Sequence, residues 1–161
     1  GICHEAMVSP MKTFLDLLHL GKLTYVGIAL RQLLTLTPGE ITVTLEDSRK
    51  LHFKKAYFAT AMNLPYEGGG FRFCPNADCQ DGLLDVIVMS GLCRLKILTL
   101  LPTAYKGWHT RFRGVYIYSC KTVTFASSLS LPLHTDGEPI LRQRQASISL
   151  ESEKLRIIAA P

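Results

Sequence analysis

The feature of the sequence that most constrains the fold is a change of periodicity at Glu40. Between residues 11 and 36, apolar residues recur at spacings of three and four, which predicts two helices separated by "HLGK" at 19–22. Pro and Gly in "TPGE" at 37–40 then end the helical segment. After Glu40, apolar and polar residues alternate, as in strands with one buried face. We expect a helical segment that packs on a core, rather than on a membrane, followed by a mainly β structure.

Strands and one further helix account for most of the chain after Glu40. Residues 83–90, "LLDVIVMS", predict a strand buried on both faces, in which Asp85 is an ordinary acid of the strand end. Helical spacing returns over 94–107. The later strands are short, alternating and joined by polar turns, as in a sandwich or a barrel. The expected strands cover residues 41–46, 51–63, 71–74, 83–90, 114–127, 129–139, 146–151 and 154–160.

The composition indicates one globular domain over residues 1–161, with 47% hydrophobic and 19% charged residues. No apolar run reaches the roughly 18 residues of a transmembrane helix. No GxGxxG or GxxxxGK[ST] motif occurs, so any loop that cradles the phosphates of ATP is expected outside this chain. The chain begins with Gly and enters "ICHEAM" without preamble, which suggests a piece of a longer protein.

The net charge of +5 allows anionic partners such as phosphates or acidic lipid headgroups. The basic clusters "KK" at 54–55 and "RQR" at 142–144 are short, and no aromatic ladder interleaves them. We therefore expect solvated faces and no nucleic acid. The five cysteines show no CxxC spacing, which argues against a zinc site and favours reduced thiols in a cytoplasmic protein.

Two carboxylates in "NADCQDGLLD" could form a metal site. Asp78 and Asp81 are three residues apart in a turn, and Gly82 lets the backbone bend sharply. Side-chain and main-chain oxygens that face one point suit Mg²⁺ or Ca²⁺. The alternative is a turn in which each carboxylate only accepts hydrogen bonds from backbone N–H groups. Spacing alone favours this alternative about two to one.

Two further segments could carry chemistry. In "LHTDGEP" at 133–139, "DG" is typical of a tight hairpin turn, and Glu138 stands on that turn, where a fixed carboxylate can act as a general base. The nearby His134 is more often structural in such a position. In "EGGG" at 67–70, glycine N–H groups could approach an anion or leave space for a bulky ligand, and the alternative is a β-bulge.

Four segments, taken in order, resemble one family of enzymes. They are "GKLTYVGIALRQLL" at 21–34, "N…GGGFRFCPNADCQDGLLDVIVMSG" at 63–91, "KGWH" at 106–109 and "TDGEP" at 135–139. They are similar to the C-terminal domain of the diacylglycerol kinase-like lipid kinases, the bacterial soluble type related to sphingosine and ceramide kinases. The resemblance spans nearly the whole chain. It implies a mainly β (α+β) fold, an antiparallel β-sandwich with two helical excursions. The partner domain, which binds nucleotide with a GGDG-type loop, would lie outside this chain.

The resemblance also implies roles for single residues. Glu138 would be the general base that deprotonates the lipid hydroxyl before its attack on the γ-phosphate of ATP, and Asp136 would orient the turn. Asp78, Asp81 and the Leu83 position would hold a structural Mg²⁺. This reverses the preference that spacing alone supports.

The cleft between the two domains would be lined by one amide and three glycines, Asn63, Gly68, Gly69 and Gly70. The chain is then the acceptor-side domain of an ATP-dependent lipid kinase, peripheral at the inner membrane surface and silent by itself. One alternative is a non-catalytic lipid- or anion-binding module, against which Glu138 argues. Another is a relative of NAD kinases, against which the GGG/DGLLD combination argues. An exposed sandwich edge would allow a homodimer.

Overall fold

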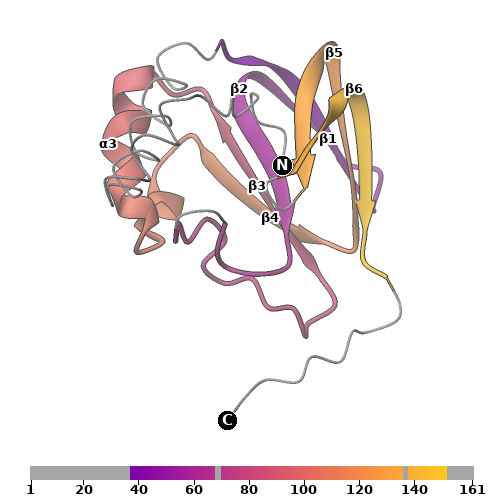
Figure 1. Cartoon of the computed structure of the whole chain (residues 1–161), viewed down its shortest axis with the longest axis horizontal. Coiled ribbons are helices and arrows are strands. Elements are labelled where there is room, and N and C mark those ends of the chain that lie inside the picture. Colours follow the sequence, from indigo (N-terminus) through magenta and orange to yellow (C-terminus); the bar gives the residue numbers. More distant parts are fainter. Residues whose placement is uncertain (1–36, 68–69, 136–137, 152–161) are drawn as a thin grey trace, which may run out of the picture.

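The computed structural model describes residues 37–67, 70–135 and 138–151. Within these residues the chain forms one antiparallel sheet of six strands, one α-helix and one short 3-10 helix (Figure 1). The elements in chain order are β1 (Gly39–Leu45), β2 (Lys50–Met62), β3 (Leu84–Ser90), α3 (Arg94–Ala104), η1 (Trp108–Arg111), β4 (Val115–Cys120), β5 (Thr122–Thr135) and β6 (Glu138–Ser149).

The strand order β4-β3-β2-β1-β5-β6 requires a strongly curved sheet. Only Lys121 separates β4 from β5, yet three strands lie between these two in the sheet. In a flat sheet their axes would be about 19 Å apart. The sheet therefore curls until the end of β4 meets the start of β5. The backbone N–H of Lys121 donates to Glu46 Oε2 at 2.7 Å, which ties this corner to the end of β1.

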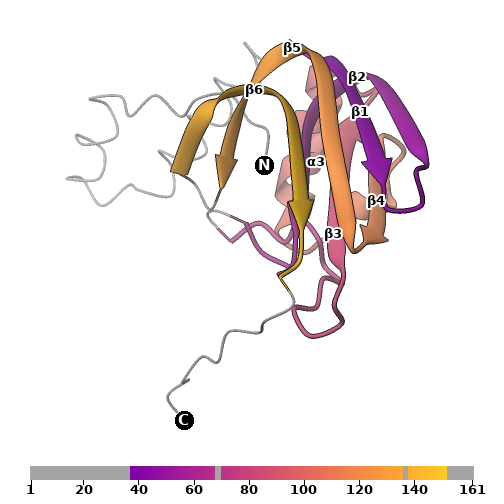
Figure 2. The same ribbon diagram turned by 90° about the vertical axis from the view of Figure 1, so that its right-hand side faces the viewer.

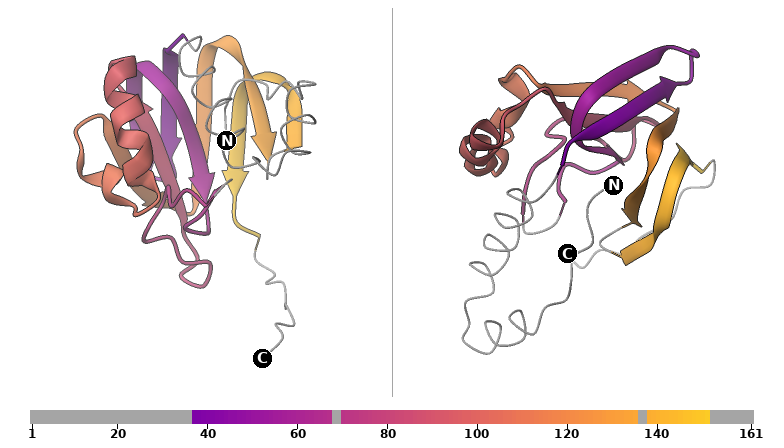
Figure 3. Two further views of the ribbon diagram at one scale, coloured as in Figure 1. Left: turned by 60° about the vertical axis from the view of Figure 1, so that its left-hand side comes forward. Right: turned by 90° about the horizontal axis from the view of Figure 1, so that it is seen from above.

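Register shifts add to the curvature. The β5–β6 pairing shifts between Ala126 and Leu131 and again before Leu133. Irregularities of this kind bend strands and increase their twist. Figures 2 and 3 show β5 and β6 arching away from the rest of the sheet. Two parts of one continuous sheet thus face each other, which gives the mainly β, sandwich-like fold that the sequence predicts.

The inner face of this curved sheet holds the larger core. In β1, Ile41, Val43 and Leu45 are buried and alternate with half-buried threonines. Val86 and Val88 of β3 and residues of β2 and β5 complete the same cluster. The alternation that follows Glu40 in the sequence therefore marks the inward-facing residues.

The opposite face of β3 is covered by α3 and by the loop before β3. Ile87 and Met89 pack there against Ile97 and Leu100 of the helix, together with Cys74 of the loop. α3 lies along this side of the sheet, at the flank opposite β5 and β6 (Figure 3). The prediction that 83–90 is buried on both faces is confirmed.

The structure corrects the prediction of a strand at 71–74. Only an isolated bridge joins Phe71 to Glu67. The backbone N–H of Arg72 donates to Ala104 O at 2.9 Å, and that of Cys74 donates to Pro65 O at 3.3 Å. These N–H groups bind a helix end and a loop, so they are not available to a sheet.

Other boundaries also differ from the expected ones. The helix expected over 94–107 ends at Ala104. The segment 114–127 is divided between β4 and β5, and 129–139 between β5 and β6. The strand expected at 146–151 is the end of one long strand, which runs from Glu138 to Ser149. The helices expected within 11–36 and the strand expected at 154–160 lie outside the described residues. No helix in the described ranges is long and apolar enough to span a bilayer.

Candidate functional site

The end of the β5–β6 hairpin lies beside the glycine-rich loop. Thr135 pairs with Glu138 and His134 with Pro139, so the chain reverses at the expected "DG" position. Nε2 of His134 lies 3.8 Å from Oε1 of Glu67, the residue directly before the three glycines. Two motifs that are about seventy positions apart in the sequence are thus brought together. His134, which the sequence favours as structural, joins them.

The glycine-rich loop is short and closed. The backbone N–H of Glu67 donates to Phe71 O at 3.0 Å. Gly70 has a φ of +87°, a backbone conformation that would be strained for a residue with a side chain. Asn63 follows the last residue of β2 and is exposed, and its cleft-lining role stays a prediction. Gly68 and Gly69 lie outside the described residues.

The proposed base stands at the start of a strand. Glu138 is the first residue of β6, and its backbone position opposite Thr135 is fixed by the ladder. The described part of the structure does not include its side chain, nor any part of Asp136. The roles of these two residues therefore stay predictions.

The acidic turn lies in a different part of the molecule. It belongs to the loop that leads into β3 and projects below that strand, apart from the β5–β6 hairpin (Figures 1 and 2). Oδ1 of Asp78 accepts from the N–H of Gln80 at 2.9 Å, and Oδ1 of Asp81 accepts from the N–H of Leu83 at 2.8 Å. Both carboxylates therefore form the side-chain turn that spacing alone favours.

These turn hydrogen bonds leave the metal prediction open. Each carboxylate has a second oxygen, Asp78 and Asp81 are both exposed, and main-chain carbonyls adjoin them. Hard oxygen donors of this kind fit Mg²⁺. Among the described residues no group of three or more His, Cys, Asp or Glu side chains could hold a metal ion. The predicted ligand set has only two carboxylates and one main-chain position, so it stays a prediction.

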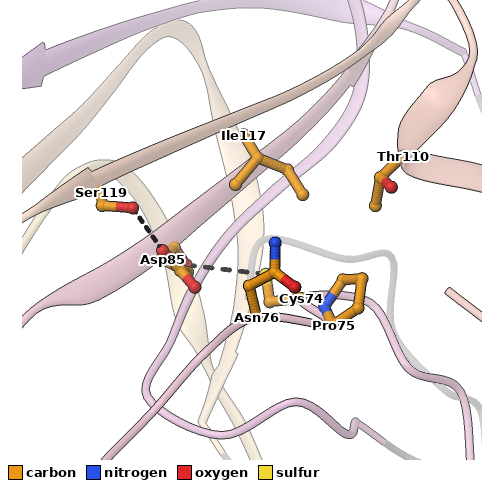
Figure 4. Close-up of a pocket in the computed structure, with 7 residues that line it drawn as sticks. All are labelled: Cys74, Pro75, Asn76, Asp85, Thr110, Ile117 and Ser119. Atoms are coloured by element: carbon orange, nitrogen blue, oxygen red, sulfur yellow. Dashed lines mark hydrogen bonds between the residues drawn. The ribbon is translucent and has the colours of Figure 1, made fainter. Parts of the chain in front are cut away.

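A cavity that the sequence did not predict lies beside the same loop. It has a volume of about 320 Å³ and opens between the loop at Cys74, the ends of β3 and β4, and η1. Figure 4 shows Asp85 and Ser119 facing each other across the two strands. The Ser119 hydroxyl donates to Asp85 Oδ1 at 2.6 Å. Asp85 thus bonds its cross-strand neighbour and lines the cavity. The sequence held one signal for this role: Asp85 is the one charged residue in the run "LLDVIVMS".

The chemistry of this cavity is that of a neutral thiol and one carboxylate. Burial raises the pKa of the Cys74 thiol to about 12, and the charges of Asp85 and Glu67 act in the same direction. Cys74 therefore stays protonated near neutral pH and is not a nucleophile. Its Sγ donates weakly to Asp85 O, at 3.8 Å.

The cysteines are free thiols and the basic clusters are solvated in the part of the chain that the structure describes. The four cysteines in the described ranges are unpaired, with Cys74 and Cys120 buried and Cys79 and Cys93 exposed. The basic side chains at 54–55 and 142–144 are all exposed.

The curved antiparallel sheet, covered on one side by a helix and a loop, can now be compared with known families. The family described as "YegS C-terminal NAD kinase beta sandwich-like domain" matches residues 5–159, and the chain belongs to this family. The likeness to the C-terminal domain of diacylglycerol kinase-like lipid kinases is thereby confirmed.

Individual relatives agree with this family. A Bacillus subtilis (strain 168) protein named "Putative lipid kinase YtlR" is 31% identical over 134 residues, which are 83% of this chain and 43% of that protein. A Mycobacterium tuberculosis "Diacylglycerol kinase" is 34% identical over 118 residues, 73% of this chain and 38% of that protein. The chain thus spans about two fifths of the length of these curated relatives.

The fold is also that of a solved structure. The crystal structure of a "putative diacylglycerol kinase" from Bacillus anthracis str. Sterne matches with a TM-score of 0.62. The match covers 90% of this chain and 48% of that chain, with 20% identity. At this identity the likeness shows the shared fold alone.

Proposed function

We propose that this chain is the acceptor-side domain of an ATP-dependent lipid kinase, which phosphorylates a lipid hydroxyl such as that of diacylglycerol. The observation that carries the proposal is the contact between Glu67 and His134. It supports a shared site, because the glycine loop and the hairpin of Glu138 are two of the segments for which the family resemblance implies roles. The names of the curated relatives support the choice of a lipid acceptor.

In the proposed mechanism, Glu138 takes the proton of the lipid hydroxyl as its oxygen attacks the γ-phosphorus of ATP. A new oxygen–phosphorus bond forms, the bond to the β,γ-bridging oxygen breaks, and ADP leaves. Asp136 holds the turn in the orientation that this proton transfer needs. The glycine loop leaves room for the lipid beside the hairpin.

In this proposal the metal ion binds at the acidic turn. Asp78, Asp81 and the main-chain oxygen of Leu83 would hold Mg²⁺, which would neutralise the two carboxylates and fix the turn. The groups that bind ATP and neutralise its γ-phosphate would come from the rest of the protein, because phosphoryl transfer needs a phosphate-binding loop that this chain lacks.

A phosphorylation assay tests the proposal. The intact protein, supplied with labelled ATP, Mg²⁺ and dispersed diacylglycerol, is expected to form phosphatidic acid, whereas the 161-residue chain alone is expected to form none. Robust turnover by the isolated chain would contradict the proposal that the groups that bind ATP lie outside this chain. If the intact protein binds the lipid but forms no product, it is a binding module and the kinase proposal is wrong.

A further inference from the structure

We propose that the outward side of α3 and the segment up to Phe112 form a docking surface for an anionic lipid bilayer. This proposal rests on the proposed function, because a lipid kinase must reach a substrate that resides in a membrane. It assigns that contact to an exposed part of the chain to which no role has been given above. We call this part the α3 surface; its apolar members are Leu95, Leu98, Tyr105, Trp108 and Phe112.

The helix α3 is apolar on both of its sides. Ile97, Leu100 and Ala104 form its buried side. Each residue of a helix advances by about 100°, so Leu95 lies about 160° around the axis from Ile97. Leu95 is accordingly 71% exposed, and Leu98, on the same outward side, is 36% exposed. A second apolar side is not needed for packing on the sheet, so it requires another explanation.

Aromatic residues continue this surface beyond the helix. Tyr105, Trp108 and Phe112 are 48%, 51% and 43% exposed. Nζ of Lys106 lies 4.9 Å from the centroid of the Trp108 ring. Tyrosine and tryptophan with neighbouring cations are enriched where a protein meets the headgroup region of a bilayer.

The charge of this region identifies the occupant as an anionic bilayer. Residues 91–113, from just before α3 to just after η1, contain no Asp or Glu. The same span holds five basic residues, Arg94, Lys96, Lys106, Arg111 and Arg113. The centres of protein–protein interfaces are depleted of charged residues, whereas here basic residues alternate with apolar ones. Interleaved basic and apolar side chains are typical of surfaces that lie on anionic lipid.

The α3 surface is also continuous with the proposed substrate site. The rings of Tyr105 and Phe71 stack with centroids 4.4 Å apart, and Phe71 directly follows Gly70. The end of the helix is tied to the same loop, since the N–H of Arg72 donates to Ala104 O. A bilayer against α3 would therefore adjoin the glycine loop.

Binding of the intact protein to vesicles tests the proposal. Vesicles of phosphatidylglycerol and phosphatidylcholine are expected to bind it, and vesicles of phosphatidylcholine alone to bind it several-fold more weakly. The double variant Leu95→Ala/Leu98→Ala is expected to lose about tenfold or more in affinity for the anionic vesicles. Lys96→Glu is expected to lose about fivefold or more. The matched control is Leu129→Ala, because Leu129 is 63% exposed but lies on β5.

The proposal is overturned if Leu95→Ala/Leu98→Ala binds anionic vesicles as tightly as Leu129→Ala does. It is also overturned if the double variant changes the oligomeric state or the unfolding midpoint while vesicle binding is retained, because the surface then covers protein. Phosphorylation of a short-chain diacylglycerol dissolved without vesicles, by the unsubstituted protein, is measured separately. Failure of that reaction contradicts the proposed function, whatever the vesicles show.

Discussion

Gly114, just before β4, illustrates how closely single residues are constrained by their surroundings. Its φ is +100°, and a Cβ there would overlap the side chain of Leu92 and lie 2.9 Å from Ser90 O. We expect Gly114→Ala to lower the free energy of unfolding by about 2 kcal/mol or more, because backbone strain and overlap add. Gly39→Ala is the control, since nothing lies within 4 Å of its Cβ position. Denaturant unfolding measures both, and equal effects would contradict this account.

The buried side chain of His109 is expected to make the free energy of unfolding depend on pH. It is 1% exposed, and burial lowers its pKa below the ordinary value of 6.5, although a hydrogen bond to Phe73 O acts in the opposite direction. The unfolded chain therefore binds a proton at a higher pH than the folded chain does. Stability due to His109 is full above the unfolded pKa and is lost as pH falls below it.

The variant His109→Gln tests this dependence, because Gln can still donate a hydrogen bond to the carbonyl of Phe73 but does not titrate. The unfolding midpoint of the unsubstituted protein is expected to fall more steeply between about pH 7 and pH 5 than that of the variant. Thermal unfolding across this range gives the two slopes. Parallel curves would show that His109 does not contribute.

Among the elements, the acidic turn carries the metal prediction. If Mg²⁺ binds the folded turn, adding it raises the unfolding midpoint by mass action. Asp81→Asn keeps an oxygen that can accept from the N–H of Leu83 but removes a charge, so it is expected to weaken this response at least tenfold in Mg²⁺ concentration. Asp47→Asn, in the exposed turn after β1, is the control. A response that is unchanged in Asp81→Asn would rule out this site.

Comparing the elements shows which strands the local sequence pattern predicts correctly and which it does not. The alternation in β1 and the apolar run of β3 predict those strands, because local period and burial agree there. Phe71 and Phe73 have the same local pattern but form no strand. Their rings instead pack against Tyr105, Phe58 and His109, contacts that depend on a helix and a strand distant in the sequence. The Asp85–Ser119 pair was missed for the same reason, since it needs the β3–β4 register.

For the whole molecule, the family and its mainly β class follow from the motifs and their order along the chain, but the curvature of the sheet does not. The curl that joins β4 to β5 through Lys121 depends on strand order, which local periodicity does not encode. The same curvature brings Glu67 to His134. The residues of the site were therefore predictable as motifs, while the adjacency of the glycine loop and the hairpin emerged only from the fold.

In the proposed function, Glu138 serves the intact protein as the base of a lipid kinase. The most direct measurement is kcat for diacylglycerol phosphorylation by Glu138→Gln, compared with Glu151→Gln, whose side chain is exposed after β6. Loss of a general base predicts a decrease of about a hundredfold or more in Glu138→Gln, with an unchanged unfolding midpoint, and near-normal activity in Glu151→Gln. A kcat for Glu138→Gln within a few-fold of the unsubstituted protein would contradict the account.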